Sequence, residues 1–298
     1  MTSRALVLGG GGPVGIAWES GLLTGLAEAG VDLAQADFIL GTSAGAFVGA
    51  RLAMGVDVLG LAAPFLTARD APPKPTAARP AGPPPDLSAL TRATTEILRG
   101  ERPAQDVRAE LGAWAADASA MSEEDFIQSF GRFLAELPDD AWPERGFACG
   151  AVDIADGTFR LWDKAAGVGL ARAVASSCSV PGVHPPVTVK ERRYMDGGAR
   201  SATNADLAQG YDRVVVIAVR VDGGQAGVFA DRLRARLAGE LQVLRDAGVQ
   251  VELVTPDAAS LTAFGVNLMD PARRPAAAQA GLDQGRAAAA ALRALWSG

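Results

Sequence analysis

The sequence lacks the residues of a disulfide framework, of a metal site and of a membrane span. Its 298 residues contain two cysteines, Cys149 and Cys178, and a single histidine, His184. Because the cysteines form no CxxC pair, neither a set of disulfides nor a zinc site is expected, and a reducing compartment, the cytoplasm, is predicted. The first apolar run, residues 5–8, is too short for a secretion signal, and no run reaches the about 18 residues of a membrane-spanning helix.

Positive charge is also scarce. The chain carries 28 Lys and Arg against 34 Asp and Glu, a net charge of -6 at pH 7. This charge repels phosphate backbones, so no nucleic-acid partner is expected. It gives no long-range attraction to anionic lipid either, and any contact with a membrane is therefore predicted to be peripheral, transient, apolar and local.

Apolar residues, by contrast, are plentiful. The composition is 49% hydrophobic and 21% charged, which is typical of a globular protein with a sizeable core. Because α/β folds of this length commonly form one unit, a single domain over residues 1–298 is predicted. The sequence contains no internal repeat and predicts no oligomeric state.

The first fifty residues alternate short apolar runs with helical patterns. Residues 5–8 lead through a glycine loop into apolar residues at helical spacing from 16 to 26, and residues 38–40 lead through a second turn into a helix from 46 to about 54. This β-α-β-α order predicts parallel strands with right-handed crossovers.

Further elements are predicted after the middle of the chain. Two strands flank a two-residue hairpin turn at Asp156 and Gly157, and a β-branched run predicts a buried parallel strand. The predicted strands span 147–154, 158–162, 214–219 and 251–254, and a closing helix spans 275–295.

An insertion is predicted over about residues 70–140. Proline is dense in residues 71–85, which excludes a helix or a central strand and predicts a loop. Residues from about 86 to 137 then show three amphipathic helical patterns. Long insertions in compact folds are often lids over a site, and a solvated linker is the alternative interpretation.

A serine stands in a glycine-flanked turn between a predicted strand and a predicted helix. Residues 41–45 read Gly-Thr-Ser-Ala-Gly, the GxSxG pattern of a nucleophile elbow. Gly41 and Gly45 leave room where strand and helix crowd the turn, and Ser43 would lie at a helix N-terminus that favours a developing oxyanion. A structural helix cap is the alternative role of this serine.

The glycine loop at residues 9–15 has three interpretations. The spacing of Gly10, Gly12 and Gly15 fits a dinucleotide fingerprint, but the turn at 41–45 replaces the acidic residue that would hold a ribose. A phosphate-binding loop would need Gly-Lys-Ser/Thr, which is absent, so no cofactor is expected. The third interpretation is an oxyanion hole, because backbone N–H groups without side chains can approach a tetrahedral intermediate closely.

Two residues are candidates for the base that a nucleophilic serine needs. His184 lies among prolines and apolar residues, which favours a packed or surface position over a triad. Asp196 precedes Gly197 and Gly198, a pattern that by itself is also typical of an ordinary turn. An aspartate with an unperturbed pKa near 3.9 would need desolvation, and it would lose activity at a lower pH than an imidazole with a pKa near 6.5.

Together these segments resemble the patatin-like phospholipases, a family with a glycine-rich GxGxxG oxyanion loop, a GxSxG elbow and a DGA/G motif. The motifs stand at residues 10–15, 41–45 and 196–198, and residues 175–183 are similar to the segment that precedes the aspartate in this family. The resemblance covers roughly residues 4–220.

The resemblance implies a three-layer α/β/α sandwich with a mainly parallel central sheet, and hydrolysis of fatty-acyl ester bonds in lipids without a metal or a cofactor. It implies that Ser43 is the nucleophile and Asp196 its base. The site residues carried over from the motifs are, for the oxyanion hole, Gly10, Gly11, Gly12 and Ala44, and, as motif glycines, Gly15, Gly41, Gly45, Gly197 and Gly198.

One position departs from the family. Val14 stands where the family commonly has Arg or Lys, so a positive charge that could favour an anionic head group is missing and phospholipid preference is less secure than acyl-ester hydrolysis. Two alternatives stay open: an esterase of the α/β-hydrolase kind that uses Ser43 with His184, and a non-catalytic lipid-binding protein that keeps the fold.

Overall fold

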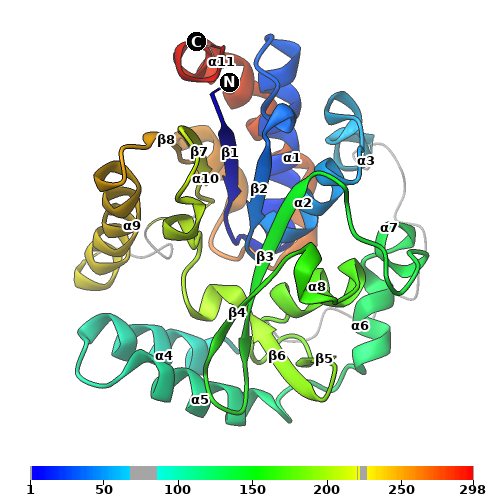
Figure 1. Ribbon diagram of the computed structural model, residues 1–298, viewed down its shortest axis with the longest axis vertical. Helices are drawn as coiled ribbons and strands as arrows, with labels where there is room; N and C mark the ends of the chain where they lie inside the picture. Colours follow the sequence, from blue (N-terminus) through cyan, green and yellow to red (C-terminus); the bar gives the residue numbers. More distant parts are fainter. Residues whose placement is uncertain (1, 68–85, 220, 222–226, 298) are drawn as a thin grey trace.

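The computed structural model describes residues 2–67, 86–219, 221 and 227–297. The proline-dense segment 71–85 lies outside the described residues. The described residues form an eight-stranded sheet with strand order β5-β6-β3-β2-β1-β7-β8, and β4 pairs with β3 outside this path (Figure 1). The strands are β1 (Arg4–Leu8), β2 (Phe38–Gly41), β3 (Gly146–Asp153), β4 (Phe159–Trp162), β5 (Val187–Val189), β6 (Arg192–Asp196), β7 (Arg213–Ile217) and β8 (Gln250–Val254).

The sheet is parallel from β3 through β2, β1 and β7 to β8, and β4, β5 and β6 join it antiparallel. This confirms the predicted mainly parallel sheet and its β-α-β-α beginning. The carboxyl ends of β1 and β2 lie side by side, since Leu8 pairs with Gly41. The glycine loop and the serine turn that follow these strands therefore meet at one edge of the sheet.

Helices cover both faces of the sheet. Side chains of β1 alternate between the faces, so that Leu6 and Leu8 enter one apolar core while Ala5 and Val7 enter a second. The first core is covered by α1 (Gly12–Glu28), α2 (Ala44–Ala53), α8 (Leu170–Ser177) and α11 (Arg274–Ser297), and the second by α9 (Val228–Asp246). The predicted three-layer sandwich is confirmed.

Residues 86–137, all of them described, contain four helices rather than the three predicted. The antiparallel pair α4 (Ser88–Arg99) and α5 (Ala104–Ala115) packs on β3 and β6 through a small core that includes Val152 and Met195. The remaining part divides into α6 (Glu123–Ser129) and α7 (Arg132–Ala135), because Gly131 adopts a positive φ of 72° between them. Two short helices, α3 (Ala63–Leu66) and α10 (Ala258–Phe264), complete the set.

The hairpin between β3 and β4 is present, but its turn is longer than two residues. Asp153 pairs with Thr158 through its N–H, and the N–H of Gly157 donates back to the Asp153 carbonyl. Gly157 has a φ of +68°, which explains the glycine at this position, while the two residues before Asp156 also belong to the turn.

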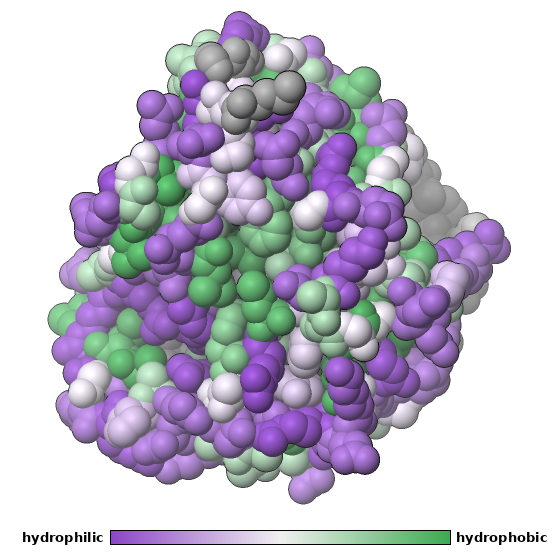
Figure 2. Space-filling view, viewed as in Figure 1, coloured by the Kyte–Doolittle hydropathy of each residue, from purple (hydrophilic) through white to green (hydrophobic). Residues whose placement is uncertain are grey.

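The surface is mostly hydrophilic. On the face shown in Figure 2, apolar side chains gather in a patch near the middle that is bordered by hydrophilic residues. No helix in the described part of the chain is both long and apolar enough to cross a membrane.

Helices α1 and α11 pack with their backbones in close contact. A Cβ on Gly21 or on Gly25 of α1 would lie 2.1 Å from a carbonyl oxygen of α11, and a Cβ on Gly281 of α11 would lie 2.3 Å from the Trp18 carbonyl. Glycines at these positions allow the C-terminal helix to pack directly on the N-terminal one.

We predict that Gly21→Ala lowers the free energy of unfolding by about 2 kcal/mol or more, because the new methyl group overlaps the Ala278 carbonyl and separates the helices. Gly239→Ala is the matched control, since Gly239 lies in α9 with open space around it. That control should stabilise the protein by about 0.5–1 kcal/mol through helix propensity. Urea unfolding of both variants measures the difference, and equal effects would contradict the close packing.

Candidate active site

Ser43 lies on a strained turn between β2 and α2. Its φ of 53° and ψ of -116° are rare for a residue with a side chain. A Cβ on Gly45 would lie 2.1 Å from the Leu8 carbonyl oxygen, and one on Gly41 would lie 2.4 Å from the Ala46 Cα. The two glycines are therefore required by space, as predicted, and the turn has the conformation expected of a nucleophile elbow.

Two residues at the C-terminal end of α8 form hydrogen bonds with the backbone of this turn. The Ser43 N–H donates to the Ser177 hydroxyl oxygen at 3.1 Å, and the Cys178 thiol donates to the Ser43 carbonyl at 3.0 Å. In the sequence, only the family resemblance pointed to residues 175–183. In the structure, Ser177 and Cys178 of this segment bind the backbone N–H and carbonyl of Ser43. Burial raises the pKa of the Cys178 thiol, so this cysteine stays a neutral donor.

Asp196 is the last residue of β6 and lies beside this turn. Its side chain is buried, and its Oδ1 accepts the Gly198 N–H at 2.7 Å. Oδ2 has no hydrogen-bond partner of ordinary geometry in the described part of the chain, yet the Ser43 hydroxyl is close enough to favour the charged carboxylate. Burial dominates and raises the pKa of Asp196 to about 7, against the opposing effects of the Ser43 hydroxyl and the Gly198 N–H.

His184 occupies a different part of the site. Its ring stacks on Phe126 with centroids 4.3 Å apart, and its Nδ1 lies 3.2 Å from the Cys178 carbonyl oxygen, to which it donates as a neutral imidazole. Burial lowers the pKa of His184 to about 4. No hydrogen bond joins this ring to Ser43 or Asp196 among the described residues, although His184 and Ser43 line the same cavity.

The glycine loop supplies fewer free donors than predicted. The Gly10 N–H donates to the Ala202 carbonyl at 2.7 Å, so it is not free to bind an oxyanion. The N–H groups of Gly11, Gly12 and Ala44 stand at the N-termini of α1 and α2 and have no other acceptor in the described part of the chain. Three of the four predicted oxyanion donors are therefore available, and Gly10 instead anchors the loop.

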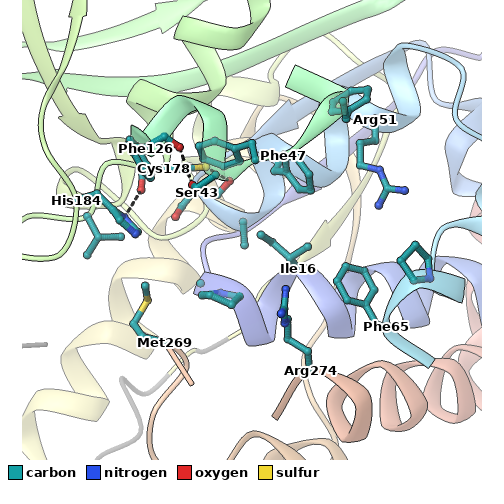
Figure 3. A pocket seen from close by; sticks show the side chains of 18 residues that line it. Ile16, Ser43, Phe47, Arg51, Phe65, Phe126, Cys178, His184, Met269 and Arg274 are labelled. Carbon is teal, nitrogen blue, oxygen red and sulfur yellow. Dashed lines mark hydrogen bonds between the residues drawn. The ribbon is translucent and has the colours of Figure 1, made fainter. Parts of the chain in front are cut away.

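A cavity of about 410 Å³ opens in front of Ser43, bounded by α1, α2, α6 and α7 (Figure 3). Its walls are mainly apolar and aromatic, and none of the described residues that line it is Asp or Glu. The aromatic side chains on its walls are Phe47, Phe65, Phe126, Phe130 and Phe133. Elsewhere among the described residues, no cluster of three or more His, Cys, Asp or Glu side chains could hold a metal ion.

The sequence model of the patatin-like phospholipases matches residues 6–208, about two thirds of the chain. The chain belongs to the patatin-like phospholipase family. The matched range contains the glycine loop, the serine turn and Asp196, whereas α9, α10 and α11 lie beyond it.

A comparison with solved structures finds distant matches that include two bacterial proteins. VipD from Legionella pneumophila is 14% identical, with a TM-score of 0.48 over 98% of this chain and 67% of its own. The type III effector ExoU is 15% identical, with a TM-score of 0.39 over 97% of this chain, which spans about half (53%) of ExoU. A comparison with curated protein sequences finds no match.

Val14, the position at which the sequence resemblance led us to note a missing cation, lies in the core. The Val14 side chain is fully buried, and its N–H donates to the Leu268 carbonyl at 3.2 Å. A Lys or Arg at this position would bring an unpaired charge into the core.

Asn204 is a supporting residue that no motif in the sequence indicated. Its side chain is fully buried, and its backbone adopts the left-handed conformation with a φ of 52°. The side-chain amide donates to the Thr42 hydroxyl at 3.0 Å and to the Ser201 carbonyl at 2.9 Å. Asn204 therefore ties the loop after Asp196 to the residue before Ser43. Its left-handed conformation is a preference of asparagine, but the sequence alone does not indicate the contact with Thr42.

Proposed function

We propose that this protein hydrolyses fatty-acyl ester bonds of lipids through a Ser43–Asp196 dyad and an acyl-enzyme intermediate. The observation that carries the proposal is a serine on a strained elbow beside a buried carboxyl with a pKa of about 7, at the mouth of an apolar cavity. The family assignment supports the lipid acyl hydrolase class, and the geometry supports the roles of the individual residues.

In the first half of the reaction, Asp196 accepts the Ser43 proton while Ser43 Oγ bonds to the ester carbonyl carbon. The tetrahedral intermediate then breaks its bond to the alcohol oxygen, and the proton passes from Asp196 to the leaving alcohol. In the second half, Asp196 takes a proton from water, the hydroxide attacks the acyl-enzyme, and Ser43 regains its proton as the fatty acid leaves. A base with a pKa near neutrality is well matched to both proton transfers.

Backbone N–H groups stabilise the negative charge on the carbonyl oxygen in this proposal. Gly11, Gly12 and Ala44 donate from two helix N-termini that converge on Ser43, and each such donor is typically worth about 10²- to 10³-fold in rate. The aromatic cavity takes the acyl chain, because burial of its methylene groups contributes about 0.8 kcal/mol each.

The dyad is favoured over a Ser43–His184 pair by two observations. The neutral His184 is held by Phe126 and the Cys178 carbonyl, and its pKa of about 4 makes it the weaker base near neutral pH.

The free and buried cysteines, Cys149 and Cys178, support the proposal of a reducing compartment, the cytoplasm.

A fluorophosphonate probe should label Ser43 covalently, since an activated serine beside an oxyanion hole attacks such reagents and a structural cap does not. Peptide mapping by mass spectrometry identifies the site, with Ser43→Ala as the unlabelled control. Labelling at another serine would contradict the assignment of Ser43 as the nucleophile, and no labelling of folded protein would favour the non-catalytic lipid-binding alternative.

Asp196→Asn should lower kcat by at least about 10²-fold with folding preserved, because the amide keeps the shape but cannot accept a proton. His184→Ala should retain most activity. Strong loss with His184→Ala and activity in Asp196→Asn would reverse the assignment.

The pH profile provides a further test of the same assignment. The base must be ionised, so with a pKa of about 7 for Asp196 the value of kcat/KM should fall about tenfold per pH unit below pH 7. A histidine base would give its acid limb near pH 4. With ordinary pKa values, an aspartate base would lose activity at a lower pH than a histidine base. Burial raises the pKa of Asp196 and lowers that of His184, so the order is reversed. Initial rates on a soluble ester between pH 4 and 9 distinguish the two limbs.

We further infer that the insertion over residues 70–140 acts as a lid. Phe126 of α6, Phe133 of α7 and Phe130 between these helices line the same cavity as Ser43. Deletion of residues 72–85 should change the ratio between hydrolysis of aggregated lipid and of short soluble esters by about tenfold, because a lid affects entry of the large substrate most. If the deletion left the activity on both substrates unaffected, the lid would be excluded.

A further inference from the structure

Phe47 lies next to Ser43 on the wall of the cavity in front of the serine. It belongs to α2, four residues after Ser43 and four before Arg51, so these three residues lie on one face of the helix. All three line the cavity, and Figure 3 shows Phe47 between the other two. The same cavity is lined by Phe65 of α3, which Figure 3 shows beyond Phe47 as seen from Ser43.

The Phe47 ring connects the helix of the serine turn to the insertion. Its centre lies 5.5 Å from the ring centre of Phe130 and 5.8 Å from that of Phe133. Phe130 in turn lies 5.2 Å from Phe126. These are contact distances for aromatic pairs, so no acyl chain fits between the rings. A chain that follows α2 must therefore pass Phe47 on the side where Ile16 of α1 lines the cavity.

The position of this ring corresponds to a definite length of acyl chain. At 1.5 Å per residue, Phe47 lies about 6 Å from Ser43 along the axis of α2. An extended hydrocarbon chain advances about 1.3 Å per carbon, since its C–C bonds are about 1.5 Å long. A chain that runs from the acyl-enzyme along α2 therefore meets the Phe47 ring about five carbons after the carbonyl, which is the length of a hexanoyl group.

Moving the ring aside would cost a longer chain much of what it gains. Each methylene group that leaves water improves binding by about fourfold. To displace Phe47, the chain must break the contacts with Phe130 and Phe133, and an aromatic pair is typically worth about 2- to 10-fold in an equilibrium constant. Loss of both pairs, about 5- to 100-fold, offsets the gain from about one to three further methylene groups.

We propose that Phe47, held in place by Phe130 and Phe133, limits the length of the acyl chain, so that the protein selects acyl groups of about six carbons and gains nothing from the next methylene groups. This inference rests on the proposed hydrolysis at Ser43. Because two of the three rings belong to the insertion, the segment that covers the cavity also fixes the residue that limits the chain.

The test measures kcat/KM for p-nitrophenyl butanoate, hexanoate and octanoate, all kept below the concentration at which they aggregate. In the wild type we expect a rise from butanoate to hexanoate and no further rise to octanoate. Phe47→Ala should raise the ratio of octanoate to hexanoate by about 5- to 100-fold, because the chain then enters the part of the cavity at Phe65 without displacing a ring. Phe47→Trp should lower the ratio of hexanoate to butanoate.

The sign of the change distinguishes a limit from a simple contact. If the Phe47 ring only packs along a passing chain, Phe47→Ala would lose more activity on octanoate than on hexanoate. That result, or an unchanged ratio, would overturn the proposal. Phe47→Leu keeps more of the packing and should shift the ratio in the same direction as Phe47→Ala, so it provides the test if the alanine variant does not fold.

Phe38→Ala is the matched control. Phe38 begins β2, at the opposite end of this strand from the serine turn, and its ring stacks on Tyr211 with centroids 5.2 Å apart. This variant also removes one ring from an aromatic contact, and it should keep the wild-type ratio of octanoate to hexanoate. An equal rise in Phe38→Ala would overturn the assignment to Phe47.

A binding measurement separates this inference from the hydrolysis proposal. In the Ser43→Ala background, the ester analogue N-methylhexanamide should raise Tm at least as much as N-methyloctanamide, and after addition of Phe47→Ala the octanamide should give the larger shift. If this pattern appears while the wild type hydrolyses no ester, the hydrolysis proposal fails and the length limit stands. If the octanamide gives the larger shift in both backgrounds, the length limit is wrong even where the wild type hydrolyses esters.

Discussion

The turn that carries Ser43 lies against the end of β1 with no space between the two backbones. Gly45 touches the Leu8 carbonyl and Gly41 touches the start of α2, so no side chain fits at either position. This contact forces Ser43 into a conformation that a residue with a side chain rarely adopts. The serine is thereby exposed to the cavity at the N-terminus of α2, and every other feature of the site is placed relative to it.

The strain of this turn is balanced by contacts from segments that are distant in the sequence. Ser177 and Cys178 bind the backbone of Ser43 on one side, and Asn204 binds Thr42 on the other. The first turn of α1, which follows the glycine loop, is bound by the C-terminal part of the chain, since the Val14 N–H donates to the Leu268 carbonyl. The site is therefore built by the whole domain, although its motifs are short.

Burial determines the chemistry of the two candidate bases. Removal from water disfavours the charged form of each group, so the pKa of Asp196 rises to about 7 while the pKa of His184 falls to about 4. The same burial that raises the pKa of the carboxyl keeps the imidazole neutral in the cavity wall.

The sequence by itself determined the features that depend on neighbouring residues. The apolar runs of β1, β2 and β7, the elbow at 41–45, the glycine loop and Asp196 before two glycines were all predicted, since each is a local pattern with a local steric cause. Only the tertiary structure decided which groups meet. The Ala202 carbonyl accepts the Gly10 N–H, and the Asn204 amide donates to the Thr42 hydroxyl. The insertion divides into four helices, and Arg51 and Arg274 line one cavity. These outcomes, and the reversed order of the two pKa values, depend on burial and on contacts between distant segments, which no short stretch of sequence specifies.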